Sequence, residues 1–153
     1  MKKYFDGLAV LLASFWVGGM WAIGYIAAPV LFQFSPDKTM AGMLAGKLFT
    51  VMAYAGMACA AYLLCYEALK SGKKVLVRAV FWLILVMLAI VLLGHFGIQP
   101  ILAELKQQAL PLYVMQSDFA APFRMWHGIS SLLYLAESLC GVVLLLKIYR
   151  HND

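Results

Sequence analysis

The sequence has 153 residues, of which 65% are hydrophobic and 12% charged, and its mean hydropathy is +0.87. Soluble domains contain about 45–50% apolar residues, so this composition excludes an ordinary soluble protein and indicates a chain that folds in lipid. The formal net charge of +5 does not indicate nucleic acid, because the basic residues lie at the ends of apolar runs and form no stripe. Since a span takes about 20 residues, we expect one all-α domain, a four-helix membrane bundle over residues 1–153.

The first apolar run has no charged residue from position 7 to position 36, and we expect a span over about 7–33. It is longer than the core of a signal peptide, which has roughly 7–15 residues, so we expect it to be retained. Pro29 removes the donor for the carbonyl group of Tyr25, four residues earlier, and predicts a kink. Small residues allow a neighbouring helix to approach closely, and we expect such packing at Gly18, Gly19 and Gly24.

The second span is expected over about 43–69, in a helix that begins at the triplet Ser35-Pro36-Asp37. We expect Ser35 to cap this helix, with proline at its first position and an acid in its first turn. Gly42 and Gly46 form a G-x-x-x-G spacing, which is typical of helix packing in membranes. Lys47 and Glu67 lie near opposite ends of the span, and we expect their side chains to extend toward the head groups.

The third and fourth spans are expected over about 77–102 and 122–147, and we expect helix to continue beyond the third span until Pro111. Eight basic residues lie at the end that carries both termini, against four at the other end. The positive-inside rule therefore predicts cytoplasmic termini, in a multi-pass protein of the inner (cytoplasmic) membrane. Three cysteines lie within apolar runs without C-x-x-C spacing, and we interpret them as small buried packing residues: Cys59, Cys65 and Cys140. No tandem repeat is recognisable.

Polar residues near the outer ends of the spans suggest a polar vestibule. His95 lies 17 residues beyond Arg78, and His127 lies three residues inside Arg124, so we expect the two histidines at one depth. We predict an outer polar site made of His127, His95, Gln99, Arg124 and Gln33.

Glu137 lies near the midplane, ten residues from Lys147 and thirteen from Arg124. A carboxylate there costs several kcal/mol unless it is protonated or has a partner. A polar stripe with spacings of three and four residues leads to it along the fourth span and should face the bundle. We predict an intramembrane polar site made of Glu137, Tyr134, Ser130, Trp16 and Tyr62, with Ser14 as a further candidate donor to the acid.

Three classes of function remain open. A transport or export protein for small molecules or ions would use Glu137 as its protonatable group. A haem- or metal-binding membrane protein would use His95 and His127 as ligands, since neutral imidazole suits iron, copper and zinc. A structural or interaction subunit would hold Glu137 as a hydrogen-bonded core acid. We expect no enzyme, because no Ser-His-acid arrangement is evident beyond one helix face. We also expect no cofactor. The small-residue spacings leave a homo-oligomer or a membrane-protein partner open.

Three segments carry a family resemblance: FWVGGMWAIGYIAAPVLF, AGMLAGKLF and FRMWHGISSLL. They resemble the membrane family called domain of unknown function 4149, of the transmembrane protein 205 type, over nearly the whole chain. His127 and Gly128 match its His-Gly motif. The resemblance implies a four-helix membrane protein of unassigned biochemistry, and the link of the eukaryotic relative to platinum-drug resistance suggests export.

A second resemblance is more distant and rests on the W-x-G-G element from Trp16 to Gly19. This element is similar to one in copper-resistance D-type and haem-synthesis membrane proteins with four helices. Those families tend to place a histidine in the first span, where this chain has none. We therefore expect no haem or copper site of their kind here.

Overall fold

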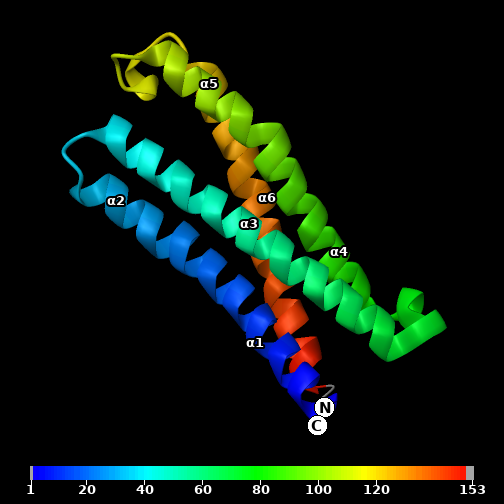
Figure 1. Ribbon diagram of the computed structural model, residues 1–153. Coiled ribbons are helices and arrows are strands. Elements are labelled where there is room, and N and C mark those ends of the chain that lie inside the picture. The colour runs from blue at the N-terminus through cyan, green and yellow to red at the C-terminus, as the bar shows by residue number, and fades with distance from the viewer. Residues whose placement is uncertain (1, 151–153) are drawn as a thin grey trace.

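Residues 2–150 are described by a computed structural model, in which every long element is a helix (Figure 1). The first span is one continuous helix built from α1 (Lys2–Trp21), the π-helical turn η1 (Ala22–Ala27) and α2 (Ala28–Phe34). The second span is α3 (Lys38–Ser71), followed by the 3₁₀ turn η2 (Gly72–Val77). The third span consists of α4 (Ala79–Leu92), the π-helical turn η3 (Leu93–Ile98) and α5 (Gln99–Ala109). The fourth span is α6 (Ala120–Arg150), which follows the 3₁₀ turn η4 (Val114–Gln116).

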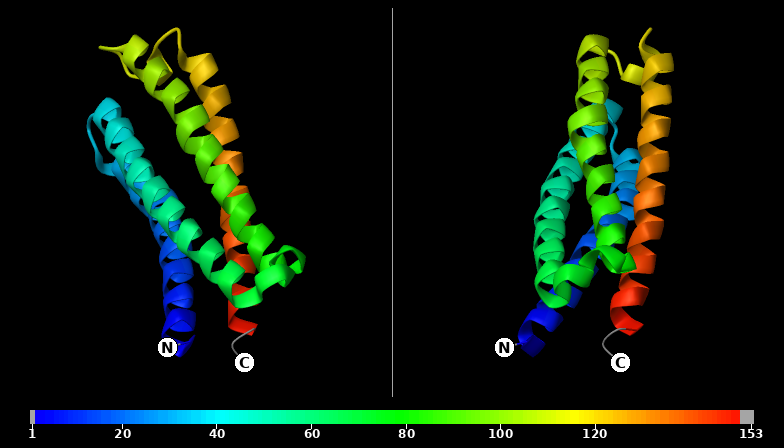
Figure 2. Two further views of the ribbon diagram at one scale, coloured as in Figure 1. Left: turned by 45° about the vertical axis from the view of Figure 1, so that its right-hand side comes forward. Right: turned by 90° about the vertical axis from the view of Figure 1, so that its right-hand side faces the viewer.

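The helices form a four-cornered bundle in which α1 packs on α3 and α6, and α4 also packs on α3 and α6. Both ends of the chain lie at one end of the bundle, together with η2; we call it the terminal end (Figure 1). The opposite end, here the distal end, carries the connections 35–37 and 110–119. Toward the distal end the α2–α3 hairpin diverges from the α5–α6 hairpin, as the left view of Figure 2 shows.

Four helical stretches are long and apolar enough to cross a membrane: Tyr4–Phe34, Lys38–Val77, Ala79–Ala109 and Ala120–Tyr149. Large apolar side chains cover their outward faces; Leu11, Val51 and Leu132, for example, are 64%, 66% and 69% exposed. A surface of this kind is stable only in lipid. The chain is therefore a multi-pass membrane protein with an all-α, four-helix bundle.

The bundle core lies between the four helices and contains side chains from each of them. Its largest fully buried members are Trp16, Met20, Leu63, Ile84, Met87, Leu144 and Val17. Alanines such as Ala13 and Ala60, both 0% exposed, let the helix backbones approach closely.

Both π-helical turns precede a proline by the same interval. η1 ends at Ala27, two residues before Pro29, and η3 ends at Ile98, two residues before Pro100. Proline cannot donate to a helical carbonyl group and its ring crowds the carbonyl four residues earlier, so the wider turn relieves this contact. In η1 the Ala28 N–H accordingly donates to the carbonyl oxygen of Ile23, five residues back. The predicted break at Pro29 is thus a π-helical turn.

The start of α3 differs from the sequence prediction. Asp37, not Ser35, is its N-cap: a carboxylate oxygen of Asp37 accepts hydrogen bonds from Thr39 N at 2.8 Å and Met40 N at 3.1 Å. Ser35 instead donates to the carbonyl oxygen of Asp37. A carboxylate at the N-cap also interacts favourably with the helix dipole, which favours the later start. At the other end of α3, Gly72 has a φ of 54°, a conformation that favours glycine and turns the chain into η2.

Candidate functional site

A polar cluster at the middle of the bundle is centred on Glu137. This residue is 4% exposed, and Trp16 of α1, itself 1% exposed, is its side-chain hydrogen-bonding neighbour. Gly56 of α3 makes room for the indole: a Cβ atom at this position would lie 2.6 Å from the Trp16 Nε1. Residues of three helices therefore meet around the acid: Trp16 of α1, Gly56 of α3 and Glu137 of α6.

Tyr134 lies one turn from Glu137 on α6 and enters the hydrogen-bond ladder of the first span. Its hydroxyl donates to the carbonyl oxygen of Met20 at 2.6 Å and accepts from the backbone N–H of Gly24. In a regular α-helix those two backbone groups would bond to each other. A side chain that inserts between them allows the helix to widen, which is how η1 begins. The Tyr134 ring lies against Gly24, where a Cβ atom would be only 2.3 Å from the ring.

Tyr25 and Ser138 complete the cluster. The Tyr25 hydroxyl donates to the Ser138 Oγ at 2.9 Å, and Ser138 is 4% exposed. The rings of Tyr25 and Tyr134 meet edge to face, with centroids 6.1 Å apart. Sequence reasoning missed both residues, although the exposed carbonyl group expected at Tyr25 marked this part of the first span.

Among residues 4–149, Glu137 has no basic partner within 4.0 Å. Within the described part of the chain, ion pairs shorter than 4.0 Å occur only between Lys70 and Asp6 and between Arg78 and Glu67, at the terminal end. The central cluster therefore offers Glu137 neutral donors only.

Three other residues predicted near Glu137 form no hydrogen bond with it. Tyr62 stacks on Tyr66, with centroids 6.4 Å apart, and its buried hydroxyl has no hydrogen-bond partner. Ser14 is exposed on the outward face of α1, because its position on the helix is turned away from the bundle. Ser130 is half-buried two turns from Glu137, toward the distal end of α6.

A second polar cluster lies at the distal end, between α3, α5 and α6. The ammonium group of Lys106 is 3.2 Å from the carbonyl oxygen of Gly42, and the amide of Gln99 donates to the carbonyl oxygen of Gly46 at 3.3 Å. The ammonium also lies 5.8 Å from the centre of the Phe123 ring, on which His127 stacks with centroids 5.7 Å apart.

The other residues of the predicted outer site lie elsewhere. His95 is half-buried and meets the edge of the Tyr54 ring at a centroid distance of 4.9 Å. α5 continues to Ala109, fourteen residues beyond His95, whereas α6 begins at Ala120, seven residues before His127. Since both of these helix ends lie at the distal end, His95 is seven residues deeper than His127, which is about 10 Å at 1.5 Å per residue.

Gln33 and Arg124 are exposed. Ligation of one haem or metal by the two histidines would require them to share a depth. In addition, no group of three or more His, Cys, Asp or Glu side chains suited to a metal occurs among the residues that the structure describes.

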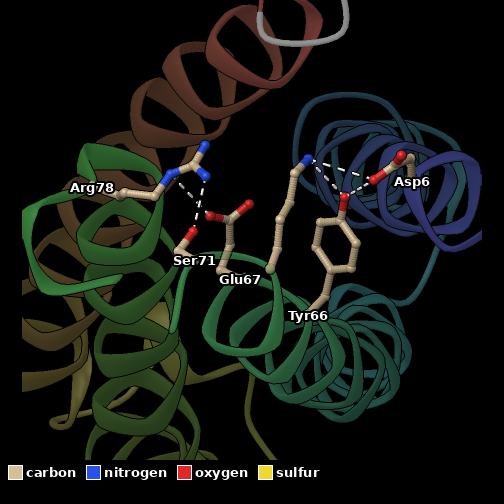
Figure 3. A network of polar contacts seen from close by, with 6 residues as sticks. Asp6, Tyr66, Glu67, Ser71 and Arg78 are labelled. Carbon is tan, nitrogen blue, oxygen red and sulfur yellow. Dashed lines mark hydrogen bonds and ion pairs between the residues drawn. The ribbon is translucent and has the colours of Figure 1, made fainter. Parts of the chain in front are cut away.

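A third polar network closes the terminal end (Figure 3). The Tyr66 hydroxyl donates to the Asp6 carboxylate, and the Lys70 ammonium lies 2.8 Å from the Tyr66 oxygen and 3.5 Å from Asp6. Beside them, Arg78 Nε lies 3.3 Å from Glu67 Oε2, and an Arg78 terminal nitrogen donates to Ser71 at 2.9 Å.

The placement of Glu67 corrects the sequence prediction. Its side chain does not extend to the head groups but is buried, with 5% of the residue exposed. The turn at Gly72 brings Arg78 back over the end of α3, and this ion pair makes burial of the carboxylate possible. Glu67 and Arg78 line a small pocket together with Asp6, Lys70 and Lys147, so that three basic side chains face two carboxylates there.

The glycines predicted for helix packing differ in their surroundings. A Cβ atom at Gly19 would lie 2.9 Å from the Met52 sulfur, so α1 and α3 are close there. Gly42 and Gly46 face Phe32 and the Gln99 and Lys106 side chains, respectively, so their G-x-x-x-G face is covered within the bundle. Gly18 is exposed and has nothing within 4 Å, and so it contributes no close helix contact. Of the cysteines, Cys59 is buried as predicted and Cys140 is half-buried, but Cys65 is exposed on the outward face of α3, which corrects its interpretation as a buried packing residue; all three are free.

Comparison with known proteins bears on identity. The family model described as a domain of unknown function (DUF4149) matches residues 11–111, which include Trp16, Gly24, Gln99 and Lys106 but not Glu137. No curated protein and no solved structure matches the chain. The resemblance predicted from the sequence motifs is thereby confirmed, while the one to copper-resistance proteins has no support from these comparisons. The chain belongs to the DUF4149 family, whose domain is one of unknown function.

Proposed function

We propose that this protein is a small carrier of the cytoplasmic membrane that couples movement of a small solute or ion to protonation of Glu137. One observation supports the proposal most directly. A carboxyl group that is 4% exposed lies at the centre of a membrane bundle with a neutral donor beside it, and no basic side chain of residues 4–149 lies within 4.0 Å of it. Ionisable residues in such positions are expensive and are typical of ion and proton pathways.

The chemistry of the cluster fits such a role. A carboxyl group among neutral neighbours is stable in an apolar interior when it carries a proton, and its charged form needs a cation or water beside it. Uptake and release of a proton would therefore change what the centre of the bundle can accommodate. The neighbouring Tyr134 hydroxyl holds two backbone groups of the first span that would otherwise bond to each other. That span thus has a second hydrogen-bonding arrangement available next to the acid.

Orientation and membrane follow from charge. Eight of the twelve Lys and Arg residues flank the terminal end, and we place that end in the cytoplasm. The distal cluster of Lys106 and His127 then faces the outer compartment, with Glu137 between it and the cytoplasm.

The test uses purified protein in liposomes that contain a pH-sensitive dye. Gradients of sodium chloride, sodium nitrate and sodium phosphate are imposed in turn, and the internal pH is followed. We expect one of these gradients to drive a pH change that Glu137→Gln abolishes. Glu104→Gln, which changes an exposed acid at the distal end, serves as the matched control and should behave like the parent.

Circular dichroism establishes that both variants retain the helical fold. If the parent protein moves no protons under any of the three gradients, or if Glu137→Gln equals the parent, the carrier function is wrong.

A further inference from the structure

Lys106 does not extend toward the head groups, as a lysine near a span end commonly does. From α5 its half-buried side chain crosses to α3, where the ammonium group lies 3.2 Å from the carbonyl oxygen of Gly42. The Phe123 ring of α6 lies on another side, 5.8 Å from the ammonium. The cation is therefore held inside the bundle by three helices.

Gln99 lies seven residues before Lys106, two helical turns away on the same face of the helix. The two donors converge over one glycine: a Cβ atom at Gly46 would lie 3.5 Å from the Gln99 Nε2 and 3.8 Å from the Lys106 Nζ. Each donor makes one hydrogen bond, to a carbonyl group within α3. The carbonyl group of Gly46 also accepts from the Thr50 hydroxyl at 3.0 Å. An ammonium group has three donors and an amide two, so donor capacity is left over.

The charge of Lys106 is not balanced locally. No carboxylate lies within 4.0 Å of it among residues 4–149, whose two ion pairs are both at the terminal end. The acid closest to Lys106 in the sequence is Glu104, which is exposed and accepts a hydrogen bond from Gln108 at 3.1 Å. The other titratable side chain in the cluster is His127, which stacks on Phe123 and interacts electrostatically with the ammonium. A cation and spare donors without an acid are the composition of an anion site.

We propose that Lys106, Gln99 and His127 form a binding site for a small oxyanion at the distal end of the bundle. Lys106 supplies the charge, Gln99 a second donor, and His127 a ring nitrogen on the side of Phe123. A phosphate group can accept hydrogen bonds from all three side chains, whether it belongs to a free anion or to a lipid head group. As a binding site the cluster stands on its own geometry; as the solute site of a carrier it rests on the function proposed above.

The test follows the side-chain signals of histidine by NMR in the ¹³C,¹⁵N-histidine-labelled protein. The protein is placed in nanodiscs of phosphatidylcholine and titrated with sodium phosphate at constant ionic strength. We expect a saturable shift of the His127 signals, while the His95 signals, about 10 Å deeper, stay unchanged. A second set of nanodiscs contains phosphatidylglycerol. If the His127 shift appears there before any phosphate is added, and depends on Lys106, the anion is the lipid phosphate.

Two variants separate an anion site from a structural bridge. Lys106→Gln keeps a donor for the Gly42 carbonyl but removes the charge, and we expect at least about tenfold weaker phosphate binding without loss of fold. Gln99→Leu should weaken binding several-fold. Lys47→Met removes an exposed lysine at the same end of the bundle and should leave the affinity unchanged.

The proposal is overturned if His127 responds in neither type of nanodisc, or if its response is the same in Lys106→Gln as in the parent. The carrier function is judged separately, because Glu137→Gln should bind phosphate as the parent does. Phosphate binding without proton-linked flux would overturn the carrier function and support the anion site. Proton-linked flux without phosphate binding at His127 would overturn the anion site and support the carrier function.

Discussion

Replacement of Gly24 by alanine tests whether the Tyr134 hydroxyl is part of the first span. A Cβ atom at Gly24 would lie 2.3 Å from the Tyr134 Cε1, 2.9 Å from Cζ and 3.0 Å from the hydroxyl oxygen. These atoms belong to a rigid ring whose hydroxyl is bonded to Met20. The ring must therefore move as a whole, and the hydrogen bond to Met20 must lengthen or break.

The magnitude follows from these contacts. Overpacking in a core costs about 1–3 kcal/mol, and loss of the hydrogen bond adds about 1 kcal/mol. Alanine returns up to about 1 kcal/mol through its better helix propensity. We expect Gly24→Ala to lower the free energy of unfolding by about 1–3 kcal/mol. Gly18→Ala, in the same span with nothing within 4 Å, gains only the propensity term and should be as stable as the parent or slightly more so.

Unfolding in detergent, followed by circular dichroism, measures both variants against the parent. A double-mutant cycle with Tyr134→Leu identifies the cause, because Gly24→Ala should cost far less once the ring is gone. Equal stabilities of Gly24→Ala and Gly18→Ala would refute the reasoning. So would a cost at Gly24 that persists without Tyr134.

Three further predictions follow from other contacts. Gly56→Ala places a Cβ atom 2.6 Å from the Trp16 Nε1 and should lower the free energy of unfolding by about 1–3 kcal/mol with a change in tryptophan fluorescence; unchanged stability and emission would contradict it. Arg78→Met leaves the buried Glu67 carboxylate without its partner and should lower the free energy of unfolding by about 3 kcal/mol. Lys73→Met, the exposed control, should lower it by under about 0.5 kcal/mol. Equal losses in the two variants would count against the ion pair. In a background without native cysteines, a membrane-impermeant maleimide added to intact cells should label Glu104→Cys and not Lys73→Cys, and the reverse pattern would invert the proposed orientation.

Much of the architecture could be predicted because hydropathy and length leave few options for a chain of this composition. The burial of Glu137 was predictable for the same reason, since its position is fixed by the span that carries it. Its donor Trp16 was predictable from depth, but Tyr62, at a similar depth, points elsewhere. Depth fixes the height of a side chain in the membrane and not its direction around the helix.

Other features depend on the path of the backbone. Glu67 is buried because the turn at Gly72 brings Arg78 back over it, which no count of flanking charges reveals. The hydrogen bond from Tyr134 to Met20 joins α6 to α1 next to η1, and the residue pattern of α6 alone does not reveal it. The different depths of His95 and His127 follow from where their helices end, since helix continues to Ala109 after His95 but begins only at Ala120 before His127. Distances counted from Arg78 and Arg124 did not include this extension.

The two hairpins share one backbone feature, a π-helical turn in their first helix, although no repeat is recognisable in the sequence. In each hairpin the first helix widens and then carries a proline two residues later, and the two helices occupy diagonal corners of the bundle. Gln99 precedes Pro100 as Ala28 precedes Pro29, so the same position carries a hydrogen-bond donor in the second hairpin and a methyl group in the first. The two hairpins therefore share a backbone feature but differ in the chemistry that they place beside it.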